Sequence, residues 1–397
     1  MIDFDFRSPT RIVFGRKSED KVAVILSEYG IKNVLIVYGH GSIKSNGLYD
    51  RVVSLLDGAS INHCELGGVT PNPDKSFCLK GVSLARENHI DGVLAIGGGS
   101  VVDVAKSIGV GFFYEGDPFD FNLHKTRPTK TLPVAVILTI AAAGSESSNS
   151  CVISDESNHI KSGFNEDLIR PLFALEDPEL TYSVSPYQTA AGIADIMMHS
   201  MERYFNESDG NQLSDEWALA LCKNVMKAGL VALKKPDDYE ARAALMLDSS
   251  LSHDGLTAIG KKAVFVVHPL EHALSGYRPD ITHGAGIAVC YLGWARYFAA
   301  SYPAKFAKLA RYLFDIVGDD EKKVAIMGVE AMRDFYVSIG LPTSLMEFGI
   351  TESDLPKLAS LASGNGTRVV GCCPQSLDKQ AIEAVYALCL RNGRVSL

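Results

Sequence analysis

Three histidines stand close together in the segment HPLEHALSGYRPDITHGAG, residues 268–286. They are His268, His272 and His283, three of the ten histidines in the chain. A helix would place His268 and His272 on one face, because residues four apart lie above one another. Imidazole is a common metal ligand, so the spacing indicates a metal site.

Two arrangements of this segment are compatible with its spacing. In the first, HPLEH matches the H-x-x-E-H pattern of some zinc proteases, with His268 and His272 as ligands and Glu271 as the base. Pro269 argues against it, because a proline inside a helix removes a backbone hydrogen bond and kinks the helix. In the second, one of the two histidines binds metal with His283 and with ligands from another helix.

The other helix is GIADIMMHSMERY, residues 192–204, which carries Asp195 and His199 four residues apart. The residues around these two are apolar, so both side chains are expected to be buried. A buried charge must be paired or bound to a metal. The alternative is an Asp–His hydrogen bond that serves the fold alone.

Short apolar runs in the first half of the chain predict the strands of a parallel sheet. The runs at 32–39, 91–99 and 132–140 are nearly continuous, as in strands that are covered on both faces. Each is followed by small residues (GHGS, GGGS and AAAGSESS), and amphipathic stretches such as 76–89 lie between them. Strand, glycine turn and helix in succession are typical of a doubly wound α/β domain.

The glycine turns indicate phosphate binding. In AIGGGSVVDVAK, residues 95–106, three glycines join a strand to a helix that starts at Ser100. Glycines let the backbone approach a phosphate, and a helix N-terminus supplies N–H groups and a positive dipole. The G-x-G-x-x-G fingerprint is absent, so a tight turn without a ligand is the alternative. The turns at 37–47 and 141–150 would lie at the same carboxyl edge of the sheet, where such sheets bind ligands.

The second half of the chain, from about residue 187, consists of segments with helical periodicity. Ser185 and Pro186 predict the N-cap and first position of its first helix. We therefore expect an α/β domain at 1–186 and an all-helical domain at 187–397.

Composition excludes several other classes of protein. The net charge is −9 and there is no run of Lys or Arg, which argues against a nucleic-acid surface. No apolar stretch is long enough to span a membrane. The N-terminal MIDFDFRSPT reads as a strand and not as a signal peptide. Eight cysteines without a CxxC pair suggest reduced thiols, and so a cytoplasmic protein.

Five motifs occur in a characteristic order: GGGSVVDVAK, the GSE of AAAGSE, GIADIMMH, HPLEH and THGAG. With them, the chain resembles the iron-containing (group III) alcohol dehydrogenase family, and more narrowly its branch of butanol dehydrogenases and NADPH-dependent aldehyde reductases. The resemblance runs from FRSPTRIVFG to IGLPTSL. It implies a dehydroquinate synthase-like architecture: a Rossmann-like nicotinamide-dinucleotide-binding domain followed by an all-helical metal-binding domain.

The resemblance also implies roles for single residues. The metal ligands fall on Asp195, His199, His268 and His283. His272 falls on a position that lines the pocket near the nicotinamide, so it is the predicted catalytic residue, relaying a proton. Glu271 then becomes a bystander or a hydrogen-bonding partner of the site.

The predicted cofactor site lies in the first half of the chain. The turn at Gly39 carries Ser42 and Lys44 but no acid that would repel a 2′-phosphate, which favours NADP(H) over NAD(H). Asn72 either caps a turn or contacts the cofactor. The other positions that the resemblance implies are Gly97, Gly98, Gly99, Ser100, Asp103, Thr139, Ala142, Asn149 and Lys161. Three residues depart from the usual motifs: His40, Ala143 (commonly Thr) and Pro269.

The predicted function is hydride transfer between NAD(P)(H) and a short- to medium-chain primary alcohol or aldehyde, with one divalent metal, Fe2+ or Zn2+, polarising the substrate oxygen. A homodimer is implied by the resemblance. The alternatives are a dehydroquinate synthase-like lyase that uses metal and NAD, the zinc protease, and a metal-stabilised binding protein without activity. The lyase would need several Lys and Arg for its phosphate-bearing substrate, and the segments around the predicted metal site have few.

Overall fold

The computed structural model describes residues 1–206 and 211–390, and the chain divides into two compact units. The α/β unit contains Arg7–Val184 and Pro236–Asp254, and the helical unit contains the rest of the chain. One predicted boundary, at 186, lies close to the observed change of unit. The prediction did not anticipate that residues 236–254 return to the α/β unit or that residues 1–6 belong to the helical one. Residues 207–210 and 391–397 of the predicted second domain lie outside the described residues.

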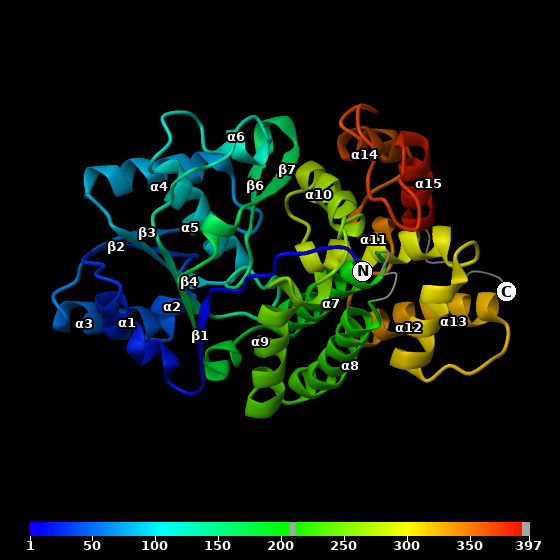
Figure 1. Cartoon of the computed structure of the whole chain (residues 1–397), viewed down its shortest axis with the longest axis horizontal. Helices are drawn as coiled ribbons and strands as arrows, with labels where there is room; N and C mark the ends of the chain where they lie inside the picture. The colour runs from blue at the N-terminus through cyan, green and yellow to red at the C-terminus, as the bar shows by residue number, and fades with distance from the viewer. Residues whose placement is uncertain (207–210, 391–397) are drawn as a thin grey trace. The chain divides into compact units, whose positions relative to one another are not determined.

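Six parallel strands form the sheet of the α/β unit (Figure 1). Their order is β1-β8-β5-β4-β2-β3. This confirms the predicted parallel sheet, including its three central apolar runs. The strands are β1 (Arg11–Phe14), β2 (Asn33–Tyr38), β3 (Asn62–Gly67), β4 (Gly92–Gly97), β5 (Val134–Leu138) and β8 (Phe173–Glu176). The antiparallel pair β6 (Ser150–Asp155) and β7 (Ile160–Asn165) forms a separate ribbon.

Helices cover both faces of this sheet, which explains why its strands are apolar throughout. Val34 and Ile36 of β2 belong to one core cluster, with residues of α1 and α3, whereas Leu35 and Val37 belong to another, with residues of α4 and α5. Alternate side chains of a strand point to opposite faces, so each face has its own core. The helices of this unit are α1 (Val22–Glu28), α2 (Ser42–Ser45), α3 (Leu48–Gly58), α4 (Lys75–Glu87), α5 (Gly99–Gly111), α6 (Phe119–Asn122) and α9 (Tyr239–His253).

The order of the strands determines where a ligand binds to the sheet. From β2 the chain passes to β3 at the edge, returns to β4 on the other side of β2, and continues to β5. The carboxyl ends of β2 and β4 therefore form a topological switch point, the usual ligand site of an open α/β sheet. The turns that follow β2, β4 and β5 lie along this one edge.

The helical unit begins as the sequence predicts. Ser185 Oγ accepts a hydrogen bond of 3.2 Å from Gln188 N, and Pro186 is the first residue of α7. Helix α11 packs against α7, α10 and α15, and its middle is buried. The helices are α7 (Pro186–Tyr204), α8 (Gln212–Lys234), α10 (Val267–Tyr277), α11 (His283–Phe298), α12 (Pro303–Phe314), α13 (Glu321–Ser338), α14 (Leu355–Ala362) and α15 (Lys379–Leu390).

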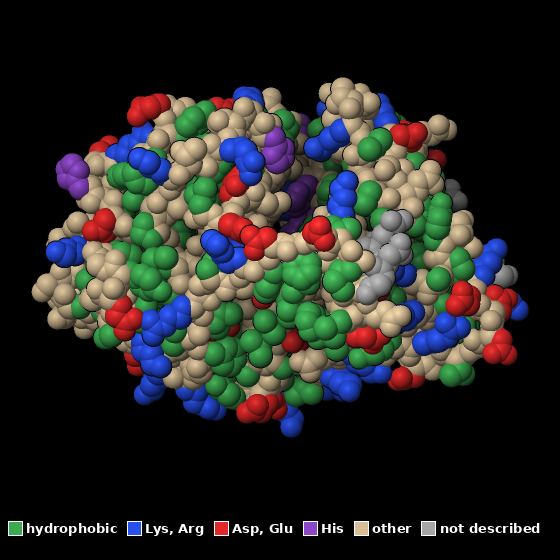
Figure 2. All heavy atoms as spheres, viewed as in Figure 1, with side chains coloured by type: hydrophobic (Ala, Val, Ile, Leu, Met, Phe, Trp, Pro, Cys, Tyr) green, Lys and Arg blue, Asp and Glu red, His purple; other side chains and the backbone are tan. Residues whose placement is uncertain are grey.

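The strand predicted in MIDFDFRSPT is wrong: residues 1–10 form neither helix nor strand, and β1 starts only at Arg11. Among the described residues, no helix has the length and apolar character that crossing a membrane requires. On the face shown in Figure 2, basic and acidic side chains are interspersed.

Candidate active site

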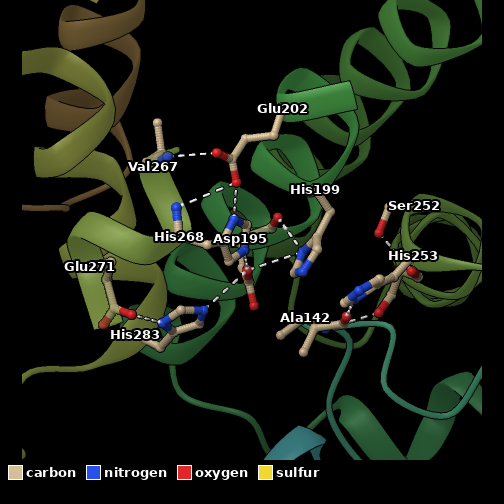
Figure 3. A network of polar contacts seen from close by, with 12 residues as sticks. Ala142, Asp195, His199, Glu202, Ser252, His253, Val267, His268, Glu271 and His283 are labelled. Atoms are coloured by element: carbon tan, nitrogen blue, oxygen red, sulfur yellow. Dashed lines mark hydrogen bonds and ion pairs between the residues drawn. The ribbon is translucent and has the colours of Figure 1, made fainter. Parts of the chain in front are cut away.

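One carboxylate oxygen lies among three histidines in the helical unit (Figure 3). Asp195 Oδ1 is 3.2 Å from His199 Nδ1, 3.5 Å from His268 Nε2 and 3.8 Å from His283 Nε2. Asp195 and His199 share a face of α7, His268 lies in the first turn of α10, and His283 is the first residue of α11. The four predicted metal ligands therefore come together from three helices.

Two atoms of this group lack the contacts that buried polar atoms normally make. Asp195 Oδ1 and His268 Nε2 are buried and, within the described part of the chain, have no hydrogen-bond partner. Their separation of 3.5 Å brings them into electrostatic contact without hydrogen-bond geometry. An unsatisfied buried polar atom costs about 1–3 kcal/mol. A cation between them would satisfy both, and one carboxylate with three imidazoles is a donor set that suits Fe2+ or Zn2+.

The charges of the group also suit a cation. Burial lowers the pKa of His199 to about 4, so this imidazole is neutral at pH 7, as a ligand must be. Burial opposes ionisation of Asp195, but His199 and His283 hold the pKa of its carboxyl well below the usual value. Burial also works against a charged His268, yet Glu202 and Asp195 together raise its pKa to about 9. Metal binding at His268 would therefore release a proton.

Two further carboxylates contact the far sides of the histidine rings (Figure 3). Glu202 accepts a hydrogen bond from His268 Nδ1, and Glu271 accepts one from His283 Nδ1. Sequence reasoning left Glu271 as a bystander or partner and missed Glu202. The signal for Glu202 was its spacing, because it follows His199 by three residues and so extends the face of α7 that carries Asp195.

Pro269 does not disturb its helix, contrary to the objection raised from the sequence. It lies in the first turn of α10, which starts at Val267. The N–H groups of a first turn have no partner inside the helix, so a proline there removes no helical hydrogen bond. The N–H groups of the neighbouring Val266, Val267 and His268 all point to the Glu202 carboxylate.

His272 lies beside the metal ligands, one turn along α10 from His268. The centroid of its ring is 6.3 Å from that of His268 and 5.7 Å from that of His283. It is partly buried, whereas His268 is buried. Two sets of residues have ligand atoms close enough to hold a cation: one consists of Asp195, His199 and His268, the other of Glu271, His272 and His283.

In the α/β unit, the turn after β4 is shaped by close packing. A Cβ on Gly97 would lie 2.5 Å from Val101 Cγ2, and one on Gly98 would lie 2.2 Å from Ile140 Cγ2. A Cβ on Gly99 would lie 3.0 Å from Ala143 Cβ. Glycine is therefore needed at 97 and 98 for packing alone. The turn also leads directly into α5, whose N-terminus favours an anion.

Asp103 holds the turn after β5 from α5. It is partly buried and accepts hydrogen bonds from Ser145 Oγ at 2.6 Å and Val152 N at 3.1 Å. The neighbouring Lys106, which sequence reasoning missed, donates to the carbonyl oxygens of Ser145, Ser148 and Ser150 at 2.7–3.0 Å. Burial lowers the pKa of Lys106 to about 8. Both side chains hold the GSE turn and the start of β6 against α5.

Helix α9 holds the same turn from another side. Ser249 Oγ accepts from Ala142 N at 3.2 Å, and His253 Nδ1 lies 2.7 Å from the carbonyl oxygen of Ala143. Ser250 Oγ lies 2.6 Å from Glu146 and 2.8 Å from Glu176, both buried carboxyl groups. Because a hydroxyl has one proton to donate, at least one of these carboxyls must be protonated to make the second hydrogen bond.

The remaining predicted cofactor residues lie at turns and strand ends of the same unit. Asn72 is buried with φ 52°, the left-handed conformation that Asn tolerates, which agrees with its turn-forming alternative. Thr139 N donates to Gly97 O, so the turns after β4 and β5 are linked. Asn149 Nδ2 donates to Asp167, and Lys161 lies in β7. Gly39 directly follows β2, and Ser42 starts α2.

Both parts of the chain match models of one family. Residues 9–178 match the iron-containing alcohol dehydrogenase model, and residues 189–390 match the C-terminal model of the Fe-containing alcohol dehydrogenase family. The chain belongs to the iron-containing alcohol dehydrogenase family. Membership makes it an NAD(P)-dependent alcohol dehydrogenase or aldehyde reductase and implies a nicotinamide dinucleotide and a divalent metal.

Relatives within this family match along nearly the whole chain. The NADH-dependent butanol dehydrogenase A of Clostridium acetobutylicum is 41% identical, covering 94% of this chain and 95% of its own. The NADPH-dependent aldehyde reductase YqhD of Escherichia coli is 30% identical, with coverage of 94% and 95%. The crystal structure of NADH-dependent butanol dehydrogenase A from Thermotoga maritima has a TM-score of 0.94 at 34% identity, covering 98% of this chain and 99% of that one.

Family membership and the hydrogen bonds of Glu271 together argue against the zinc-protease alternative. The glutamate of HPLEH would be the base of such an enzyme. In this dehydrogenase, however, the Glu271 carboxylate is buried and accepts hydrogen bonds from His283 and Ser275, so it is engaged within the protein. The family also gives the glycine turns of the α/β unit a purpose that a protease would not.

Proposed function

We propose that Asp195, His199, His268 and His283 hold the divalent metal of this dehydrogenase. The observation that carries the proposal is the meeting of three imidazoles at one buried carboxylate oxygen, with Asp195 Oδ1 and His268 Nε2 lacking hydrogen-bond partners among the described residues. When bound, a divalent metal with an open coordination position acts as a Lewis acid towards an alcohol or carbonyl oxygen. The four side chains would fix the position of that charge, with Asp195, His199 and His268 buried and His283 partly exposed.

We propose that His272 donates the proton in aldehyde reduction and accepts it in alcohol oxidation. Reduction of an aldehyde adds a hydride to carbon and a proton to oxygen, and oxidation of an alcohol removes both. Hydride transfer belongs to the nicotinamide, so the protein must supply or accept the proton. His272 is partly buried beside the ligand rings, and an imidazole titrates near neutral pH.

The cofactor is proposed to bind at the carboxyl edge of the sheet, with its pyrophosphate at Gly97–Ser100 and the N-terminus of α5. Support comes from the topological switch point between β2 and β4 and from the N-terminus of α5, which directly follows the glycine turn. Asp103 would act there by holding Ser145 and β6 in place. The other proposed cofactor residues are Gly39, Ser42, Asn72, Thr139, Ala142, Asn149 and Lys161.

The predicted preference for NADP(H) over NAD(H) stays a prediction. It depends on the turn after β2, which has no acid of its own and includes Lys44. However, Glu65 of the neighbouring β3 lies 3.0 Å from Lys44 Nζ, so a carboxylate not anticipated from the sequence shares that cation. The names of the relatives differ in the cofactor that they state: the two butanol dehydrogenases of Clostridium acetobutylicum are called NADH-dependent, and YqhD is called NADPH-dependent. A strong preference for NADH in catalytic efficiency would refute the prediction.

Several finer properties are proposals as well. The donor set suits Fe2+ and Zn2+ alike, and elemental analysis of protein made without added metal decides between them.

A homodimer is proposed because Ile2, Phe4 and Phe6 expose apolar side chains along the irregular N-terminal segment. Sedimentation analysis tests it, and a monomer at micromolar concentration would refute it. A cytoplasmic location remains an expectation.

The substrate is proposed to be a short- to medium-chain primary aldehyde or alcohol, in line with the butanol dehydrogenases among its relatives. The test is the absorbance of the reduced nicotinamide after addition of butanal to the metal-loaded protein with NADPH or NADH. The absorbance should fall. No change with any member of a panel of aldehydes and alcohols would refute the proposal.

A further inference from the structure

We propose that Glu271 is a positioning residue that fixes the ring of His283 for metal binding, and that Glu202 does the same for His268. The inference rests on the proposed metal site and adds to it the two groups that determine which ring nitrogen faces the cation. Neither carboxylate belongs to the proposed ligand set.

Glu271 is confined by its surroundings. Its side chain is fully buried, with Oε1 accepting from Ser275 Oγ and Oε2 accepting from His283 Nδ1. On its other side it packs against the start of α11, where a Cβ on Gly286 would lie 3.0 Å from Glu271 Cγ. The carboxylate thus holds one orientation, and His283 must orient its Nδ1 towards it.

Glu202 is held in a comparable way. One oxygen accepts from the backbone N–H groups of Val266 and Val267, and the other accepts from His268 Nδ1. The carboxylate therefore caps the start of α10 and orients the first histidine of that helix at the same time. Negative charge is also favourable at a helix N-terminus.

These two contacts determine the tautomer of each histidine. A neutral imidazole has one N–H and one lone pair, and donating Nδ1–H to a carboxylate leaves the lone pair on Nε2. The Nε2 atoms of His268 and His283 are the atoms that face Asp195, at 3.5 and 3.8 Å. Carboxylates that hold ligand histidines in this way commonly raise metal affinity by about 10–100-fold.

The geometry also offers a competing role for Glu271. Its carboxylate, His272 and His283 form a set whose ligand atoms lie within 4.8 Å of one another. If that set held the metal, Glu271 would be a ligand. We favour the positioning role because both of its oxygens already accept hydrogen bonds, one of them from the ring that would have to be its fellow ligand.

The test compares Glu271→Leu and Glu271→Gln with the wild-type protein. Metal-free protein is titrated with Zn2+ in competition with a chromophoric chelator, and the visible spectrum of the Co2+-loaded protein reports ligand geometry. Glu271→Leu removes the hydrogen-bond acceptor, so this variant should bind Zn2+ about 10–100-fold more weakly than the wild type. It should still saturate at one metal per chain. Gln keeps an acceptor without the charge, so its affinity should lie between those of wild type and Leu, with a Co2+ spectrum closer to wild type.

The matched control is Glu330→Leu, which removes a largely buried glutamate of α13 that lies 3.5 Å from Arg296 in the same unit. It should leave Zn2+ affinity unchanged. Equal weakening in this control, wild-type affinity in Glu271→Leu, or failure of Glu271→Leu to bind metal even at saturation would each overturn the inference. Glu202 is a poorer probe, because its loss also uncaps α10. If the wild-type protein bound no metal, the proposed function would fail; normal wild-type binding with an unaffected Leu variant defeats this inference alone.

Discussion

Asp195 Oδ1 and His268 Nε2 face each other at 3.5 Å, both buried, although they come from helices far apart in the sequence. Nothing in the described part of the protein hydrogen-bonds to either atom. Burying two polar atoms without hydrogen-bond partners costs free energy, and a cation bound between them would offset that cost.

Removing a ligand should therefore remove the metal. We expect Asp195→Ala and His283→Ala each to retain less than about a tenth of the bound metal, because the proposed set uses all four side chains and each substitution leaves one coordination position without its protein ligand. The measurement is the metal content per chain after gel filtration, with circular dichroism to confirm folding. Full metal occupancy in either variant would exclude that residue from the ligand set.

His272 should behave differently from the ligands. We expect His272→Ala to bind one metal per chain with normal affinity but to lose about 100-fold in kcat, the lower range of what a positioned proton donor contributes. Elemental analysis and steady-state kinetics of the same preparation provide both numbers. If the variant loses its metal, His272 is a ligand and the proton must pass through another group.

Lys44 should influence the choice between the two nicotinamide dinucleotides. A cation near the turn after β2 can bind the 2′-phosphate that only NADP(H) has. We expect Lys44→Gln to lower kcat/KM for NADPH about tenfold more than for NADH, as loss of one charge-assisted hydrogen bond would. Lys125→Gln, which removes an exposed lysine paired with Asp120 in the same unit, is the control. Equal changes with both cofactors would place the phosphate elsewhere.

The acid pair around Ser250 should make stability depend on pH. Burial raises the pKa of Glu176 well above its usual value, and burial also raises that of Glu146. The native state thus keeps a proton that the unfolded chain releases near its usual pKa of about 4.5. The stabilising contribution is complete below that pH and is lost as the pH rises through the folded-state pKa.

Glu176→Gln removes one of these titrating groups. The melting temperature of the variant minus that of the wild type should increase from pH 5 to pH 8, because the variant does not release a proton at this position on unfolding. Thermal unfolding followed by circular dichroism at several pH values measures the difference. A constant difference across this range would show that the pair does not hold the expected proton.

Much of the architecture could be predicted because it depends on local patterns. Runs of buried residues such as 32–39 identify strands covered on both faces, and Ser185 with Pro186 marks the start of α7. Ligands on one helix, such as Asp195 and His199, follow from a spacing of four. The pattern offered His283 as their fellow ligand only as one of two alternatives, and the resemblance to a family chose between them, because nothing local says which helices meet.

The missed features depend on contacts between distant segments. Glu65 reaches Lys44 only because β3 lies beside β2 in the sheet, and Glu202 reaches His268 only because α7 and α10 meet. Pro269 was judged as an interior residue because the sequence does not show that α10 starts at Val267. The return of α9 to the α/β unit has no sequence signal, since an amphipathic helix suits either unit.

That return of residues 236–254 has a consequence for synthesis of the chain. Ser249, Ser250 and His253 of α9 complete the turn at 142–147, so the α/β unit lacks part of its own structure until residue 254 has left the ribosome. By then α7 and α8 of the other unit have already been made. In many multidomain proteins the N-terminal domain folds before the next domain is synthesised, but the α/β unit of this protein cannot be completed in that order. The α/β unit can be completed only after α7 and α8 of the helical unit have been synthesised.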